Sequence, residues 1–240
     1  MYSYDFRVGF SQSDDSRLMT LPAIIDMFQD SSCFHSDDLG VGFDYLLPLD
    51  MVWILNYWEV EILRRPKYGE RLFVGTFPYD FKGFFGYRNF CLQTVGKDGT
   101  AGEMIVKANS LWLLMDWKNM RPAKVTDKMI SAYDIEPKLD MTYSSRKISI
   151  PDVPGQKLES VIVGRQHLDS NGHVNNGQYI KIAMSSLTYP DTLKRLRAEY
   201  REQAHLNDEI IPVLYKTDSE MVVELTGVSG NTYMLAELKF

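Results

Sequence analysis

The stretch LDSNGHVNNGQYIKIAMSSL, residues 168–187, places short polar side chains directly before apolar residues at helical spacing. Asn, Asp, Ser and Gly are typical of turns and helix caps, so one interpretation is a turn that leads into a buried helix. The other is a catalytic loop, because Asp169, Asn171 and His173 occupy alternate positions just before the N–H groups of a helix N-terminus. Other parts of the chain distinguish the two interpretations.

A second stretch of the chain resembles the first. Residues 13–32, SDDSRLMTLPAIIDMFQDSS, align with residues 168–187 at an offset of 155 positions, and Asp14 then falls on Asp169. Each stretch has an acidic turn followed by one apolar stripe at helical spacing, which predicts two helices in equivalent places. The apolar positions are Leu21, Ile24, Ile25 and Phe28 in the first stretch and Tyr179, Ile182 and Ala183 in the second.

A further match follows in the same order. EVEILRRPKYGERL (59–72) aligns with RAEYREQAHLNDEI (197–210) at an offset of 138 positions, and the turn signals YGE and LND coincide. Two colinear matches predict an internal duplication. The smaller offset predicts a shorter path from helix to strand in the second half.

Most of the remaining chain has the pattern of strands. Trp58, Val60 and Ile62 alternate with Glu59 and Glu61, as in a strand with one buried face. The other predicted strands are 70–77, 87–95 and 103–114 in the first half and 159–167, 195–203, 209–218, 220–228 and 232–240 in the second.

Each half therefore combines one long helix with several antiparallel strands. A sheet must cover its apolar face, and wrapping it around a single helix achieves this. The pattern predicts an α+β protein of the double hot-dog class, with two tandem helix-wrapped antiparallel sheets that form one pseudo-symmetric unit. The expected domains are residues 1–128 and 158–240, joined by a Pro- and Ser-containing linker at 129–157.

Composition excludes several classes of function. The net charge of −6 gives no electrostatic basis for binding nucleic acid. No secretion signal and no apolar run of about 20 residues is found, so we expect a cytoplasmic protein without a membrane span. Cys33 and Cys91 form no CxxC motif and the histidines no HExxH motif, so we expect no metal and no cofactor.

The polar motif also resembles a known family signature. DSNGHVNNGQYI is similar to the Asp-x-Asn-x-His-Val-Asn-Asn-x-x-Tyr motif of the acyl-acyl carrier protein thioesterases, which include plant enzymes and bacterial relatives. Residues 21–40, 53–70 and 110–125 resemble further segments of that family, so the resemblance covers nearly the whole chain. It implies a double hot-dog hydrolase of fatty acid biosynthesis, which cleaves the thioester between a fatty acyl chain and the phosphopantetheine of acyl carrier protein.

The resemblance implies that Asp169, Asn171 and His173 are catalytic. The plant pattern continues with a Glu-Cys pair, and the matching positions here hold Gln203 and Ala204. The missing cysteine argues against a thiol nucleophile. Gln203 can hold a water molecule by hydrogen bonds but cannot accept its proton. Glu199 or Glu202 is the alternative for that role.

The same residues suit the chemistry of a thioester. Hydrolysis needs a positioned water, a proton acceptor and donors for the developing oxyanion. His173 titrates near neutrality and suits general acid–base catalysis, whereas helix N–H groups suit the oxyanion. Asn175 and Asn176 are expected to cap and shape the turn, with substrate binding as a second role. The first half has Ser16 and Leu18 in place of Asn171 and His173, which predicts one active site per chain.

The first half is then expected to provide the acyl pocket. Trp53 and Trp112 are the preferred lining residues, with plain core packing as the alternative, and Phe84, Phe85 and Trp117 are further aromatic candidates. Acyl carrier protein is acidic, so its docking site should be basic. The two clusters considered are Arg64, Arg65 and Lys67, and Lys194, Arg195 and Arg197, each of which can equally be solvated strand ends.

Two other functions are compatible with the sequence. One is a thioesterase that acts on acyl-CoA, because both carriers present the same pantetheine thioester. The other is a catalytically silent hot-dog protein that binds acyl chains, which the residues Gln203 and Ala204 would suit. The sequence leaves open whether the protein forms a homodimer.

Overall fold

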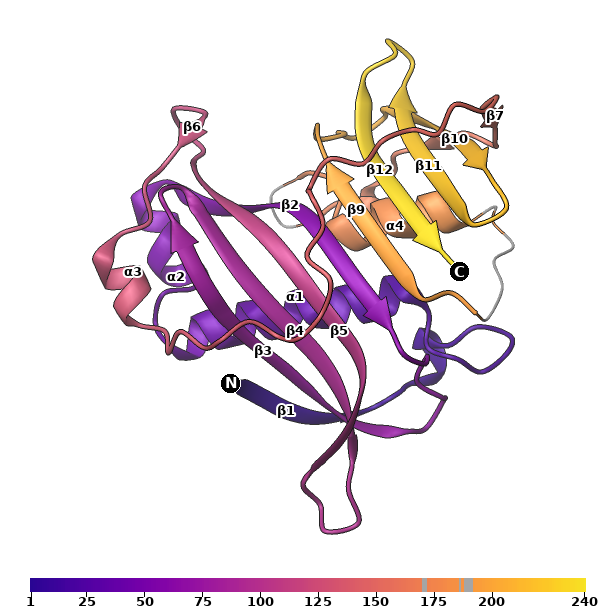
Figure 1. Cartoon of the computed structure of the whole chain (residues 1–240). Coiled ribbons are helices and arrows are strands. Elements are labelled where there is room, and N and C mark those ends of the chain that lie inside the picture. Colours follow the sequence, from indigo (N-terminus) through magenta and orange to yellow (C-terminus); the bar gives the residue numbers. More distant parts are fainter. Residues whose placement is uncertain (170–171, 186, 188–191) are drawn as a thin grey trace. The chain divides into compact units, whose positions relative to one another are not determined.

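The computed structural model of the chain describes residues 1–169, 172–185, 187 and 192–240 (Figure 1). The chain divides into two compact units. The first comprises Met1–Asn56 and Val60–Tyr143, and the second comprises Tyr57–Glu59 and Ser144–Phe240. Strand β2, Met51–Ile62, therefore contributes its central residues to the second unit.

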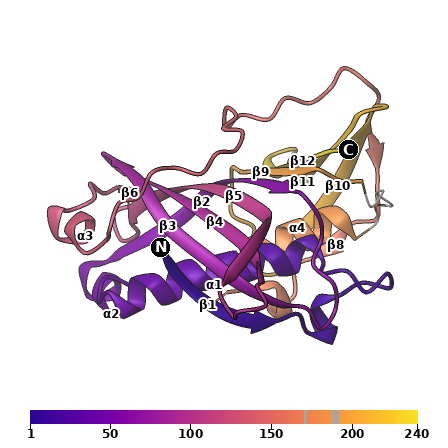
Figure 2. The same cartoon turned by 60° about the horizontal axis from the view of Figure 1, so that its bottom comes forward.

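The first unit is a helix packed on an antiparallel sheet. Its strands lie in the order β1-β3-β4-β5-β2, and the helix α1 runs across one face of this sheet (Figure 2). The elements are β1 (Tyr2–Arg7), η1 (Phe10–Gln12), α1 (Leu21–Asp38), α2 (Phe43–Leu46), η2 (Leu47–Leu49), β3 (Arg71–Lys82), β4 (Phe85–Val95), β5 (Ala101–Asp116), β6 (Arg121–Pro122) and α3 (Asp127–Ser131).

Helix α1 begins and packs as its sequence dictates. The Thr20 side chain accepts a hydrogen bond from the backbone N–H of Ala23, which satisfies one of the donors left open at a helix N-terminus. The stripe predicted from the sequence, Ile24, Ile25 and Phe28, is fully buried. The Phe28 ring lies 5.2 Å from that of Phe90 on β4, so the helix covers the middle of the sheet.

The second unit repeats this architecture with a shorter helix. Its strands lie in the order β9-β12-β11-β10-β7, and the nine-residue helix α4 packs on β11 and β12. The elements are β7 (Gln156–Lys157), β8 (Val161–Ile162), η3 (Arg165–His167), α4 (Asn176–Met184), β9 (Arg195–Tyr200), β10 (Glu209–Lys216), β11 (Glu220–Gly227) and β12 (Thr232–Lys239). Two helix-on-sheet units confirm the predicted fold.

Two of the predicted strands are wrong in extent. In the segment predicted as strand 159–167, only Val161 and Ile162 pair with β10, and residues 165–167 form the 3-10 helix η3. The strand predicted over 195–203 ends at Tyr200. Glu199 and Gln203 are thus not related by strand alternation, which removes the argument that they share a face.

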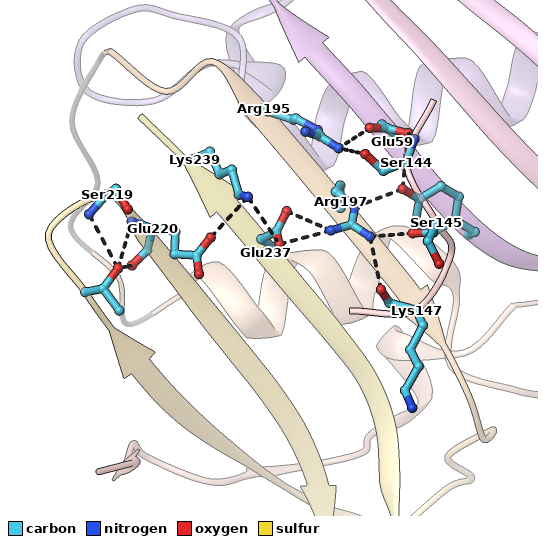
Figure 3. A network of polar contacts seen from close by, with 12 residues as sticks. Glu59, Ser144, Ser145, Lys147, Arg195, Arg197, Ser219, Glu220, Glu237 and Lys239 are labelled. Atoms are coloured by element: carbon cyan, nitrogen blue, oxygen red, sulfur yellow. Dashed lines mark hydrogen bonds and ion pairs between the residues drawn. The ribbon is translucent and has the colours of Figure 1, made fainter. Parts of the chain in front are cut away.

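A buried polar network ties the segment 144–147 to the sheet of the second unit (Figure 3). Arg195 binds both the Glu59 carboxylate and the Ser144 hydroxyl, and Glu59 is fully buried. Arg197 makes two 3.0 Å hydrogen bonds to Glu237 and a 2.9 Å bond to the Tyr57 hydroxyl. Its guanidinium also donates to the backbone carbonyls of Ser145 and Lys147.

This network involves two residues of one predicted basic cluster. The Arg195 and Arg197 side chains are only 18% and 9% exposed, and both bind carboxylates of the same unit. These two arginines stabilise the protein internally, whereas Lys194 of the same cluster is exposed.

Candidate active site

The polar motif forms a tight turn in the second unit between η3 and α4. The backbone N–H of Asp169 donates to the carbonyl of His173 at 2.8 Å, and the N–H of His173 donates to the Asp169 carboxylate at 3.2 Å. Gly172 closes the turn with a φ of +78°, a conformation that favours glycine. Asp169 therefore fixes the backbone of His173. The predicted catalytic residue Asn171 lies outside the described residues.

Helix α4 begins directly after this turn. The Asn175 side chain caps the helix by accepting a 2.8 Å hydrogen bond from the N–H of Gly177, which confirms the predicted capping role. The N–H of Gln178 donates to the Asn175 carbonyl at 3.0 Å. Asn176 is the first helical residue, and its carbonyl accepts a hydrogen bond from the Tyr200 hydroxyl. The N–H groups of Gly177 and Gln178 are thus used within the protein.

The last tyrosine of the motif fixes a second segment beside the turn. The Tyr179 hydroxyl accepts a 2.7 Å hydrogen bond from the N–H of Ala204, and the Ala204 carbonyl accepts one from the N–H of Val174. Burial raises the pKa of Tyr179 to about 12, so its hydroxyl stays neutral at physiological pH. Ala204, at the position of the plant cysteine, is therefore bonded to the residue that follows His173.

The three candidates for holding water differ in environment. Gln203 is exposed and lies beyond the end of β9. Glu202 is also exposed and accepts a hydrogen bond from Asn231 at 2.9 Å. Glu199 is 5% exposed and accepts hydrogen bonds from the N–H of Ile148 and from Arg201. Ala204 contacts the turn through its hydrogen bond with Val174. Gln203 directly precedes Ala204 and is therefore the candidate nearest to this contact in the sequence.

A further side chain, His205, lies beside His173 although no sequence motif marks it. The His205 ring lies 5.4 Å from the His173 ring, centroid to centroid, at an interplanar angle of 75°. The repeat offsets of 155 and 138 place His173 and His205 over Leu18 and Lys67, but the sequence does not show that these positions meet. Those two first-half residues form an isolated β-bridge.

The first unit contains a turn with several corresponding hydrogen bonds. The N–H of Asp14 donates to the Leu18 carbonyl at 2.9 Å, and the N–H of Leu18 donates to the Asp14 carboxylate at 3.0 Å. Met19 donates to the carbonyl of Pro66 as Val174 does to that of Ala204. The 3-10 helices η1 and η3, which precede the two turns, also correspond at the offset of 155. These correspondences support the internal duplication.

The two turns differ in the charges around them. In the first unit Arg65, 4% exposed, binds the Asp14 carboxylate and donates to two backbone carbonyls. Arg64 makes a bidentate pair with Glu70 at 3.1 and 2.6 Å. The equivalent positions in the second unit hold Gln203 and Glu202. Both first-unit arginines form internal ion pairs, whereas Lys67 of the same cluster is exposed.

The aromatic candidates of the first unit divide into two groups. Trp112 on β5 is the cross-strand partner of Gly86, and the Trp53 ring would lie 3.3 Å from a Cβ at Gly86. Cross-strand partners share a face, and Phe90, four residues along β4 from Gly86, contacts α1. Trp53 and Trp112 thus point to the helix-covered face. Phe85 is partly buried, whereas Phe84 and Trp117 are 43% and 51% exposed.

Neither thiol is suited to act as a nucleophile. Both cysteines lie in the first unit, Cys33 on α1 and Cys91 on β4. Burial raises the pKa of each thiol to about 11, so both stay protonated at neutral pH. Among the described residues, no helix is long and apolar enough to cross a bilayer.

Solved structures share this fold over the whole chain. An acyl-ACP thioesterase from Bacteroides thetaiotaomicron superposes with a TM-score of 0.87 at 21% identity, over 100% of this chain and 97% of that one. A 12:0-ACP thioesterase from Umbellularia californica gives a TM-score of 0.83 at 18% identity, over 99% and 96% of the two chains. The protein is thus a double hot-dog protein.

Sequence comparison identifies the family. The model of the acyl-ACP thioesterase N-terminal domain matches residues 1–133, and the chain therefore belongs to the acyl-ACP thioesterase family. Oleoyl-acyl carrier protein thioesterase 2 of Arabidopsis thaliana, a chloroplast protein, is 27% identical over 252 aligned positions. That alignment covers 96% of this chain and 67% of the plant protein, so the chain spans about two thirds of its relative's length.

Proposed function

We propose that the protein is a thiolester hydrolase that cleaves fatty acyl-acyl carrier protein into free fatty acid and holo-carrier protein. The observation that carries this proposal is the turn of the second unit, which holds His173 at the N-terminus of α4 in a member of this family. The equivalent turn of the first unit has Leu18 at that position, so each chain carries one site.

The proposed mechanism assigns a role to each motif residue. His173 accepts the proton of the attacking water and returns a proton to the leaving pantetheine thiolate. Asp169 holds His173 through its hydrogen bond to the backbone N–H, and Asn171 orients the water or the thioester carbonyl. The positive end of the α4 dipole favours the oxyanion. Asn175 and Asn176 support the site by forming the start of that helix.

The proposal assigns the water-holding role to Gln203. It adjoins Ala204, whose carbonyl is bonded to Val174, and it is exposed to solvent. Glu199 is less suited, because its carboxylate already accepts hydrogen bonds from Ile148 and Arg201. A Gln that holds water leaves the proton to His173, since an amide cannot take it.

We further propose that the first unit binds the acyl chain, with Trp53 and Trp112 on the helix-covered face of its sheet.

The substrate carries the phosphopantetheine, so the enzyme needs no cofactor of its own, and dialysis against a chelator should leave turnover unchanged. We place the reaction in the cytoplasm. Light scattering of the purified protein distinguishes a monomer from a homodimer.

One experiment tests the function and its alternatives together. Purified protein is supplied with the same acyl chain on acyl carrier protein and on CoA, and released fatty acid is measured. We expect faster turnover of the carrier-protein substrate. Higher kcat/KM on acyl-CoA would support the acyl-CoA thioesterase. Binding of the acyl chain without any release from either substrate would support a silent binding protein.

A further inference from the structure

The His205 side chain contacts the His173 ring although it is exposed to solvent. The ring is 63% exposed, so burial in a hydrophobic core does not account for its position. Its centroid lies 5.4 Å from that of His173 at an interplanar angle of 75°. Aromatic rings prefer this edge-to-face arrangement at centroid distances of roughly 4.5–7 Å.

The backbone on both sides of this contact is fixed by hydrogen bonds. The N–H of His205 donates to the Asp208 carboxylate at 2.8 Å, and the preceding residue, Ala204, is bonded to both Tyr179 and Val174. His173 is in turn held by Asp169. The two imidazoles therefore meet where the residues next to them, Val174 and Ala204, are joined by a hydrogen bond.

The surroundings of the pair are acidic. Asp169 lies on the turn of His173, and Asp208 is 3.9 Å from Nδ1 of His205. Glu202 precedes His205 by three residues, Tyr179 of α4 is bonded to Ala204, and Tyr233 of β12 donates to Asp208 at 3.3 Å. Carboxylates therefore lie on both sides of the pair, and at so short a separation two imidazolium ions would repel each other.

The first unit shows that the fold does not require this pair. Leu18 and Lys67 occupy the equivalent backbone positions and form a β-bridge, with an apolar side chain and an aliphatic amine. Equivalent positions in the two units therefore hold quite different side chains, and of the two described pairs only Leu18 and Lys67 form a bridge. The fold alone therefore does not account for a histidine at position 205, so we look for its role at the neighbouring His173.

We propose that His205 is a positioning residue of the thioesterase site, whose ring holds the imidazole of His173 in its working orientation and restricts the pair to one positive charge. This inference rests on the proposed function. A neutral His205 stabilises the imidazolium that forms on His173 when water gives up its proton. A charged His205 opposes it, so activity is greatest when only one ring carries a proton.

Three substitutions of His205 distinguish the effect of its aromatic ring from the effect of its positive charge. His205→Ala should lower kcat on acyl-acyl carrier protein about fivefold with little change in KM, the scale of one edge-to-face contact. His205→Phe, which keeps a ring, should restore most of that loss. His205→Lys, which copies Lys67, should move the acid limb of the kcat/KM profile to lower pH by about half a unit, as expected for a fixed charge roughly 5–6 Å from the His173 ring in water. Leu206→Ala, a neighbouring 40% exposed side chain, is the control and should match wild type.

A second measurement does not depend on hydrolysis. The imidazole Cε1–H resonances of His173 are followed against pH by NMR in substrate-free wild type and in His205→Lys and His205→Phe. The titration midpoint of His173 should be lowest in the Lys variant and highest in the Phe variant. The same midpoint in all three proteins, or wild-type kcat in His205→Ala, would overturn the inference. An inactive wild type would instead refute the proposed function, and the NMR order would still test the pair.

Discussion

The turn at residues 9–20 and the described residues of the turn at 164–175 share several hydrogen bonds but differ in the side chains around them. Each has an aspartate that accepts the N–H of the residue four positions later, Asp14 from Leu18 and Asp169 from His173. In the first unit a buried arginine, Arg65, neutralises the aspartate, whereas Gln203 takes that position in the second. Under the proposed function, the first copy of the turn is structural and the second carries the chemistry.

Replacing the histidine that separates the two turns should have the largest effect. His173→Leu, which copies Leu18, should lower kcat by about two orders of magnitude or more, the scale of lost acid–base catalysis. Asp169→Ala should act similarly, because it releases the backbone of His173. Turnover of acyl-acyl carrier protein measures both, and circular dichroism checks that the variants are folded. Leu18→His is the matched control and should not change kcat, since Ser16 stands in place of Asn171.

Removing the arginine of the first turn should affect stability and leave the chemistry unchanged. Arg65→Gln copies Gln203, and loss of one partner of a largely buried ion pair should cost about 2 kcal/mol of unfolding free energy. Urea unfolding measures the loss, and kcat per folded molecule should stay at the wild-type value. A loss of kcat equal to that of His173→Leu would show that the first turn also takes part in catalysis.

The same pair predicts a dependence of stability on pH. Partial burial would raise the pKa of Asp14, but hydrogen bonds from Arg65 and Leu18 and the Arg65 charge outweigh it and lower the pKa. A depressed carboxyl pKa adds stability that is present above the unfolded-state value of about 3.9 and is lost as the pH falls through the folded-state value. Thermal melting in this acid range should show a smaller pH dependence for Arg65→Gln than for wild type.

Introducing into the second turn an arginine equivalent to Arg65 should reduce activity less than the loss of His173 does. Gln203→Arg should bind the Asp169 carboxylate and lower kcat about tenfold, the equivalent of one pKa unit of interaction. Gln203→Ala should lose a water contact, and Gln203→Glu should keep or raise turnover because it restores the carboxylate of the plant pattern. If Glu199→Gln or Glu202→Gln loses more activity than Gln203→Ala, that glutamate holds the water instead. Turnover at neutral pH, with thermal melting as the folding check, ranks all five variants.

The smallest effect is expected at the cysteines. The plant cysteine position holds Ala204 in the second turn, and its first-unit equivalent is Pro66, so neither turn carries a thiol. Cys33→Ser and Cys91→Ser should therefore leave kcat within about twofold of wild type, because buried thiols of raised pKa are unreactive at pH 7. Mass spectrometry of the enzyme during turnover should find no acyl group on either residue. An acylated cysteine would contradict the water mechanism.

The duplication made much of the fold predictable from the sequence. The two helices and most strands follow from local periodicity, and the match of Asp14 to Asp169 marks two turns whose hydrogen bonds correspond. The fold prediction was wrong where the local sequence pattern is typical of a strand but the segment pairs with its neighbour over only a few residues. Residues 159–167 have strand composition, but the chain closes into η3 at Arg165 and leaves only two residues to pair with β10.

Properties that depend on distant partners could not be read from the sequence. Arg65 and Arg197 were considered as docking residues because basic clusters are usually exposed. The structure pairs Arg65 with Asp14, 51 positions away, and Arg197 with Glu237, 40 positions away. His205 was missed for the same reason, since its contact with His173 spans two separate turns.

The polar network of the second unit also constrains how this chain is made. Glu59 leaves the ribosome early, yet Ser144 and Arg195, which bind it, follow 85 and 136 positions later, and Arg197 follows Tyr57 by 140. A buried carboxylate without its cation is costly, so this part of β2 cannot reach its final environment until β9 has been synthesised. A fragment that begins at Ser144 would in turn leave Arg195 without Glu59. Such a fragment should therefore be less stable than the same unit within the whole chain.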